Sequence, residues 1–193
     1  SIFRKQRNTR VLLGEAVRID PEKRVVVLSD GGPIPYDTLV VATGAHHSYF
    51  GHDEWAPFAP GLKTIDDATE IRRRILIAFE AAEREADPDR RREWMTFLVI
   101  GGGPTGVELA GAIGEISRDT LKRDFRTFDP ACTRVILIEA VDRLLPTFPP
   151  GLSQRAKEAL EALGVEVRLG TRVTGMEAGR VKLMKPDGGS DEI

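Results

Sequence analysis

Hydrophobic residues in the first part of the chain fall in three short runs that are rich in β-branched side chains. These runs are residues 11–19, 24–29 and 38–43, and the turn-forming sequences DPEK and DGGPIPYD separate them. The pattern predicts three consecutive strands joined by tight turns, which is a β-meander. Residues 44–63 then combine glycine, proline and aromatic residues without a period, as is typical of an ordered connector.

A long amphipathic helix is predicted to begin at Thr64, because Thr64 or Asp66 can cap its first turn. Apolar residues then recur at helical spacing: Ile71, Ile75, Ala78, Phe79 and Ala82. We expect this helix to end by Pro88, since proline interrupts a helix interior. The arginine runs 72–74 and 90–92 are interpreted as solvated surface.

Strands and helices alternate in the second half of the chain. The periodicity predicts strands at 97–100, 134–139 and 165–169, and helices at 104–123 and 152–163, the second of which Gly164 is placed to cap. A βαβαβ order requires a parallel sheet with right-handed crossovers, and ligands bind where strand carboxyl ends meet helix amino ends. Residues 173–176 and 180–184 predict a hairpin that turns at EAG, and the final DGGSDEI is interpreted as a turn with no strand after it.

The expected fold class is therefore α/β: a Rossmann-like parallel βαβαβ sheet with a β-hairpin or meander, preceded by a partial β-meander. We expect three regions, namely residues 1–50, a connector at 51–63, and a nucleotide-binding domain at 64–193. The unpartnered meander at the start and the half-finished hairpin at the end predict that both ends were cut from something longer.

Composition excludes several functions. The 193 residues include 28 Lys and Arg against 30 Asp and Glu, so no strong field favours nucleic acid as a partner. The single Cys132 excludes an internal disulfide and any CxxC pair, and favours a reducing compartment. No apolar run approaches the roughly 18 residues of a membrane span, and the opening SIFRKQRNTR lacks the apolar core of a signal peptide.

The sequence FLVIGGGPTGVELAG places a glycine cluster between a predicted strand and a predicted helix. Gly101, Gly103 and Gly106 fit G-x-G-x-x-G, in which the first glycine permits the turn, the second lets a pyrophosphate approach, and the third lets helix and strand pack closely. The amino end of the helix offers N–H groups and a partial positive charge to the phosphates. We therefore predict a dinucleotide site that includes Gly102, Pro104 and Thr105; a glycine turn without a ligand is the alternative.

Glu139 stands at the end of the second predicted strand of this unit. Its carboxylate can accept both hydroxyls of the adenosine ribose and would repel the additional phosphate of NADP, so NAD(H) is favoured. Ala140 is placed beside it in the same site. The spacing from the glycines exceeds the usual 20 residues or so, and residues 117–133 look like the extra length. Arg143 could instead receive an NADP phosphate, although a surface arginine is the simpler interpretation.

Two motifs resemble those of a known enzyme family. Residues 36–45, YDTLVVATGA, resemble the second flavin-contacting motif of flavoproteins with two dinucleotide-binding domains, and GGGPTGVELAG at 101–111 resembles their nicotinamide-domain motif. The connector sequence ATGAHHSYFGHDEWAPFAPGLKTIDDA and the later EAVDRLLPTFPP are similar to those of type II NADH dehydrogenases. These are single-subunit NADH:quinone oxidoreductases of the pyridine nucleotide-disulfide oxidoreductase superfamily, and the resemblance covers nearly all of the chain.

The resemblance implies that this chain binds NADH and that the intact protein also binds FAD, which the fragment is not expected to hold because the N-terminal FAD motif is absent. Hydride would pass from NADH to FAD and electrons then to quinone, and the isolated fragment would be inactive. Thr43, Gly44 and Ala45 would approach the flavin. Glu108 would be the catalytic residue that orients the nicotinamide or tunes its charge; the alternative is a helix-start carboxylate favoured by the dipole.

The resemblance also implies a cytoplasmic protein, peripheral to the inner face of the cell membrane through a missing C-terminal part, and a possible homodimer. Two other functions stay open: another FAD-dependent enzyme of the superfamily, acting on disulfides or an electron-transfer protein, and a non-catalytic nucleotide-sensing module. A metal site is not expected, because no cysteine or clustered carboxylate completes a ligand set with His46, His47 and His52.

Overall fold

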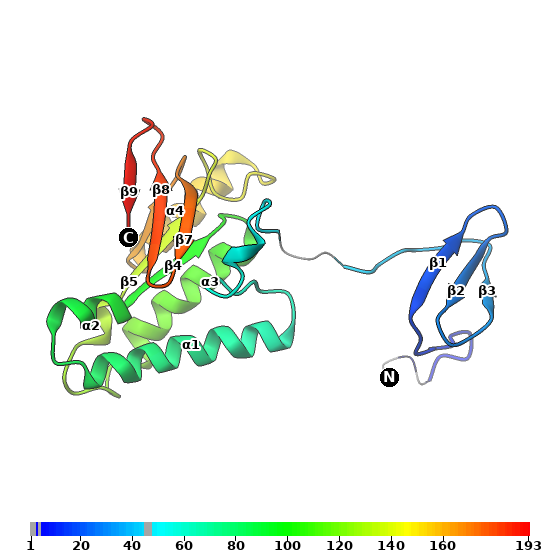
Figure 1. Ribbon diagram of the computed structural model, residues 1–193, viewed down its shortest axis with the longest axis horizontal. Helices are drawn as coiled ribbons and strands as arrows, with labels where there is room; N and C mark the ends of the chain where they lie inside the picture. Colours follow the sequence, from blue (N-terminus) through cyan, green and yellow to red (C-terminus); the bar gives the residue numbers. More distant parts are fainter. Residues whose placement is uncertain (1–2, 4, 45–47) are drawn as a thin grey trace. The chain divides into compact units, whose positions relative to one another are not determined.

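The computed structural model describes residues 3, 5–44 and 48–193, and it divides into two compact units, 1–45 and 46–193 (Figure 1). Ala45, His46 and His47 lie outside the described residues.

The first unit is a small antiparallel sheet in the order β1-β2-β3 (Figure 1). Its strands are β1 (Ala16–Asp20), β2 (Val25–Leu28) and β3 (Pro33–Pro35). The meander is therefore confirmed, and its first strand is shorter than the run 11–19. The third strand was wrongly predicted at 38–43, because DGGPIP turns back at once and pairs Val27 with Pro33.

Residues 38–43 form no strand in this unit. Val40 is 82% exposed and Val41 is 60% exposed. A β-branched run becomes a strand only where its backbone N–H and C=O groups find a neighbouring strand. The position of the third strand of the meander therefore depends on which residues find a pairing strand, and not on the local sequence alone.

The second unit contains the predicted parallel βαβαβ arrangement. The sheet has the order β4-β5-β6, with β5 paired in parallel to both neighbours. Its strands are β4 (Thr96–Ile100), β5 (Arg134–Ile138) and β6 (Val165–Arg168). The connecting helices are α3 (Pro104–Glu115) and α4 (Pro150–Ala162). Gly164 follows α4 with φ of 75°, which confirms its predicted role as a cap.

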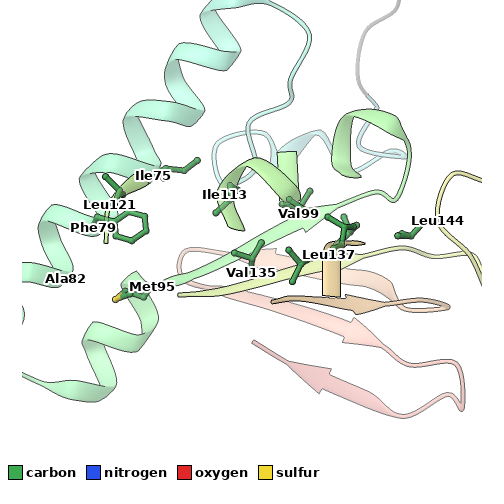
Figure 2. Packing of buried hydrophobic residues seen from close by; sticks show 13 residues of the cluster. Ile75, Phe79, Ala82, Met95, Val99, Ile113, Leu121, Val135, Leu137 and Leu144 are labelled. Carbon is green, nitrogen blue, oxygen red and sulfur yellow. The ribbon is translucent and has the colours of Figure 1, made fainter. Parts of the chain in front are cut away.

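The central strand β5 is buried on both faces. Val135 and Leu137 pack with side chains of the helices, as Figure 2 shows, whereas Ile136 and Ile138 pack with Leu183 on the opposite face. That opposite face is covered by an antiparallel sheet of β7 (Arg172–Glu177), β8 (Arg180–Met184) and β9 (Ser190–Glu192). The unit is thus layered as helices, parallel sheet and antiparallel sheet.

The last strand corrects one prediction. The final residues were expected to be a turn without a strand, yet β9 pairs antiparallel with β8. Gly188 adopts φ of 82° and the Lys185 N–H donates to the Gly189 carbonyl at 2.8 Å, so the glycines close a tight turn that returns the chain to β8. The residues of β9 are all polar, so no apolar run in the sequence indicates a strand there.

The helices begin largely as expected but differ in length. In α1 (Ile65–Arg84) Thr64 is the N-cap, as predicted, and a capping box joins it to Asp67; the helix ends before Pro88 as predicted. A separate helix, α2 (Pro88–Trp94), was not predicted; Asp87 caps it and Pro88 occupies its first turn.

The predicted helix 104–123 is regular only to Glu115, followed by a π-helical turn over Ile116–Thr120. Short 3₁₀ turns lie at Asp53–Trp55 and Pro130–Cys132.

Candidate functional site

The turn between β4 and α3 requires glycine at both of its ends. Gly101 has φ of 105°, a conformation that favours glycine, and its N–H donates to the Ile138 carbonyl at 2.8 Å. A Cβ atom added to Gly106 would lie 1.9 Å from the Gly101 carbonyl oxygen. The first and last glycines therefore let the chain leave the sheet and enter the helix at very close range.

The middle of the turn is open. Gly103 is the N-cap of α3 and Pro104 follows it in the first turn. A Cβ atom added to Gly103 would have no neighbour within 4 Å. The first N–H groups of a helix have no partner within the helix, and Gly103 has no side chain that could accept from them. Thr105 and Gly106 thus offer N–H groups beside open space, an arrangement suited to a phosphate.

Glu139 lies at the carboxyl end of β5 and is half-buried. Its Oε2 accepts the Gly102 N–H at 2.5 Å, and its Oε1 accepts the Val141 N–H at 3.0 Å. A carboxylate has about four lone-pair positions, so acceptor capacity remains for ribose hydroxyls. The exposed Ala140 comes next in the chain. The structure therefore brings the predicted acid together with the glycine turn, and adds a structural hydrogen bond that the sequence did not reveal.

A groove of about 1230 Å³ lies within the second unit and includes the glycine turn. Its wall near the turn is formed by Gly101 and by residues 103–106. Other lining residues come from the connector, from α1, and from residues 176–181 at the β7–β8 turn. The participation of the β7–β8 turn was not predicted, because nothing in its sequence EAG indicates a ligand.

An ion pair on α1 fixes one side of this groove. Glu70 binds Arg73 at 2.7 Å and Arg74 at 2.7 Å, and the Arg73 hydrogen bond, followed by that of Arg74, lowers the pKa of Glu70 to about 2. Arg74 also donates to the Pro57 carbonyl at 3.2 Å. The connector is thus held against α1 by an arginine whose charge is paired. Trp55 in this connector stacks on His52, with ring centroids 4.2 Å apart.

The other predicted site residues lie apart from this turn or outside the described residues. Glu108 is exposed on α3, one turn beyond Pro104. Thr43 and Gly44 are exposed in the first unit, where Gly44 has φ of 76° and open space at its Cβ position. Ala45 lies outside the described residues. Arg143 is half-buried and donates to the Pro146 carbonyl at 2.6 Å, so it closes the loop after β5.

Within residues 3, 5–44 and 48–193, no group of three or more His, Cys, Asp or Glu side chains is placed to hold a metal ion. In the same part of the chain, no helix has both the length and the apolar character needed to cross a bilayer. His46 and His47 lie outside this part.

A parallel βαβαβ sheet with this glycine turn, and an acid at the end of its second strand, defines the class of Rossmann-type nucleotide-binding domains. The sequence matches the pyridine nucleotide-disulphide oxidoreductase family over residues 1–192. The chain belongs to this family.

Two relatives within the family are both named as type II NADH:quinone oxidoreductases. The chain is 50% identical over 190 residues to the type II NADH:quinone oxidoreductase Ndh of Mycobacterium tuberculosis, covering 97% of this chain and 41% of the relative. It is 49% identical to NdhA of the same organism, covering 100% of this chain and 42% of that protein. The chain thus spans about two-fifths of the length of these relatives.

A solved structure confirms the fold. NDH2 from Plasmodium falciparum, determined in complex with NADH, matches with a TM-score of 0.79 at 23% identity, covering 94% of this chain and 38% of that one. At this identity the likeness shows the fold alone. The predicted α/β class and the predicted family are therefore both confirmed.

Proposed function

We propose that this chain is the NADH-binding part of an FAD-dependent NADH:quinone oxidoreductase. One observation carries the proposal: the glycine turn is open at Gly103 and joined to Glu139, in a chain 50% identical to a type II NADH:quinone oxidoreductase. A function that used the turn only for packing would not need a vacant side at Gly103, since a Cβ atom there would meet nothing.

The pyrophosphate of NADH would lie over Gly103 and receive the N–H groups of Thr105 and Gly106. The amino end of α3 adds the partial positive charge of the helix dipole. Gly101 and Gly102 shape the turn, and Pro104 lacks the N–H that would otherwise need a partner in the first turn. These residues would bind the cofactor by backbone groups alone, without a lysine or arginine.

Glu139 would select NADH over NADPH. The adenosine ribose would donate its hydroxyls to the carboxylate next to Ala140, and the additional phosphate of NADPH would bring a second negative charge to the same place. The Arg143 side chain donates a hydrogen bond to the Pro146 carbonyl within its own loop. This bond supports a structural role for Arg143 in the loop rather than binding of the additional phosphate of NADPH.

The first unit would contribute to flavin binding, and the exposed acid on α3 would act on the nicotinamide. We assign residues 1–50 to a partial FAD-binding domain, 51–63 to the connector and 64–193 to the NADH-binding domain. Thr43, Gly44 and Ala45 would contact FAD, and the open backbone at Gly44 is compatible with a close approach. FAD, when bound, would supply the two-electron carrier between NADH and quinone. Glu108 would orient the nicotinamide or tune the charge around it.

The remaining parts of the proposal rest on the resemblance to type II enzymes. They are quinone as the electron acceptor, a position at the inner face of the cell membrane, and a homodimer.

A parallel titration of the 193-residue chain with NADH and NADPH tests the proposal, after an absorbance scan for bound flavin. We expect NADH to bind, NADPH to bind at least about tenfold more weakly, and no flavin absorbance. Equal affinity for the two nucleotides would contradict the role of Glu139. Absence of binding to either would contradict NADH binding by this chain and favour a structural glycine turn.

A further inference from the structure

The segment that follows β5 folds back over the second glycine of the turn. The Glu139 carboxylate accepts the Gly102 N–H at 2.5 Å, and the Leu145 N–H donates to the Gly102 carbonyl at 2.8 Å. Both backbone polar groups of Gly102 are therefore bound by residues 139–145. Since each of these hydrogen bonds fixes one peptide plane, the segment fixes the orientation of the chain on both sides of Gly102.

Leu144 fills the remaining space beside this glycine. A Cβ atom added to Gly102 would lie 2.7 Å from Leu144 Cδ2, and the Leu144 side chain is only 1% exposed. Leu144 belongs to the main hydrophobic cluster, where Figure 2 shows it at one end, beyond Leu137. One leucine thus joins the glycine turn to the core of the parallel sheet.

The backbone beside Leu144 is held in an uncommon conformation. Leu145 has φ of 50°, in the left-handed region that non-glycine residues seldom occupy. The Leu145 carbonyl accepts the Phe148 N–H at 2.9 Å and the Ser153 hydroxyl at 3.4 Å. In this conformation the Leu145 N–H donates to the Gly102 carbonyl. Such a conformation persists only where surrounding contacts maintain it, and the buried Leu144 side chain supplies the apolar part of those contacts.

We propose that Leu144 is a positioning residue for the NADH phosphates. It touches no ligand itself; it holds Gly102, and through Gly102 it sets the place of the Gly103 backbone and of the N–H groups of Thr105 and Gly106. The inference rests on the proposed NADH site. Protein interiors are tightly packed, so a change at one side chain displaces its neighbours. We therefore expect a cavity at Leu144 to shift the glycine turn while the domain remains folded.

The test compares Leu144→Ala with Leu183→Ala in the 193-residue chain. Leu183 is also 1% exposed but packs on the other face of the sheet, with Ile136 and Ile138. The two substitutions remove the same atoms from equally buried sites. Leu144→Met, which keeps most of the volume, is the conservative variant. All chains are compared at a temperature at which circular dichroism shows each of them folded.

Two measurements separate this inference from the proposed function. In calorimetric titrations we expect Leu144→Ala to weaken NADH binding about tenfold, while Leu183→Ala and Leu144→Met stay within about threefold of the unsubstituted chain. In amide hydrogen exchange without nucleotide, the Gly102 and Leu145 amides should lose protection in Leu144→Ala alone. Unchanged exchange at these amides, or equal losses in Leu183→Ala, would overturn the positioning role. If the unsubstituted chain binds no NADH, the proposed function fails, and the exchange measurement still decides whether Leu144 holds the turn.

Discussion

The Glu139 carboxylate accepts the Gly102 N–H at 2.5 Å, although the two residues lie 37 positions apart in the chain. The acid at the end of β5 and the glycine turn at the end of β4 therefore form one structural unit. A second bond, from the Val141 N–H to Oε1, occupies the other carboxylate oxygen. Only a carboxylate offers two acceptor oxygens in this place, because the amide nitrogen of glutamine is a donor.

Replacing Glu139 is expected to weaken NADH binding and to narrow the preference for NADH over NADPH. Charge-assisted hydrogen bonds contribute about 1.5–3 kcal/mol each, so Glu139→Ala should lower NADH affinity about 10- to 100-fold. NADPH affinity should fall less, since the repulsion of its additional phosphate disappears at the same time. Calorimetric titration with both nucleotides measures the two effects.

Two further variants control this prediction. Glu139→Gln keeps the shape but leaves one backbone N–H facing an amide nitrogen, and should resemble the alanine variant. Asp142→Ala removes a negative charge from an exposed position of the same loop and should leave both affinities nearly unchanged. An unaltered ratio of NADH to NADPH affinity in Glu139→Ala would show that another residue selects the nucleotide.

Gly103→Val is expected to abolish nucleotide binding while leaving the domain folded. The added Cβ atom meets no protein atom within 4 Å, so the substitution intrudes only on the space assigned to the pyrophosphate. We expect NADH affinity to fall at least about a hundredfold. Stability should fall by about 1 kcal/mol, since valine is a poorer N-cap than glycine. Titration and thermal unfolding of the same sample measure the two quantities.

Gly106→Ala is the contrasting variant in the same turn. Its Cβ atom would stand 1.9 Å from the Gly101 carbonyl oxygen, so we expect a loss of stability of about 3 kcal/mol or more. Chemical unfolding of the two variants side by side distinguishes a ligand position from a packing position. Retained NADH affinity in Gly103→Val would place the phosphates elsewhere. A large loss of stability in that variant would make Gly103 a packing position instead.

The sequence alone predicted the features that depend on local pattern. The apolar run of β5, with Ile136 buried, and the glycines around α3 have periodicity and turn chemistry that can be recognised without a partner. The position of Glu139 near the turn followed from parallel topology, because the carboxyl ends of neighbouring strands share one edge.

The features that depend on distant partners were missed. The exposed run at Val40 has strand composition but no strand beside it in the first unit, and the polar β9 became a strand because β8 offers it backbone partners. The hydrogen bond of Glu139 to Gly102, and the packing of Leu144, join residues far apart in sequence. No propensity or spacing rule contains such contacts.

Glu108→Gln should separate binding from electron transfer. Glu108 is exposed on α3 and does not contribute to the turn itself, so we expect NADH affinity to stay within about threefold of the original value. In a protein that joins this chain to an FAD-binding segment, loss of the charge should slow flavin reduction by NADH about tenfold or more. Stopped-flow absorbance measures that rate.

Glu115→Gln, at an exposed position on the same helix, is the matched control for Glu108 and should leave the rate unchanged. A normal rate of flavin reduction in Glu108→Gln would mean that this carboxylate serves only the amino end of the helix.

Glu83 on α1 should make stability depend on pH in the acid range. Its carboxylate accepts the Thr127 hydroxyl at 2.8 Å and the N–H groups of Thr127 and Arg126 at 3.1 Å, which ties residues 117–133 to the helix. The hydroxyl bond, followed by the backbone bond of Thr127, holds the pKa of Glu83 below its ordinary value of 4.5. A depressed pKa in the folded state means that the stabilisation is fully present above pH 4.5 and is lost as the pH falls through the lower, folded value.

Urea unfolding of the unsubstituted chain and of Glu83→Gln at a series of pH values measures this contribution. Glutamine cannot accept at both positions, so the variant should be less stable at pH 7, and the difference in unfolding free energy should shrink below pH 4.5, the ordinary pKa of this carboxyl. Glu80→Gln, at an exposed position of the same helix, should show no comparable difference. A difference that stays constant from pH 7 to pH 3 would mean that the ionised form of Glu83 does not hold the segment. In that case the bonds to Thr127 and Arg126 are as strong with a neutral acceptor, and the charge of Glu83 contributes nothing to holding residues 117–133.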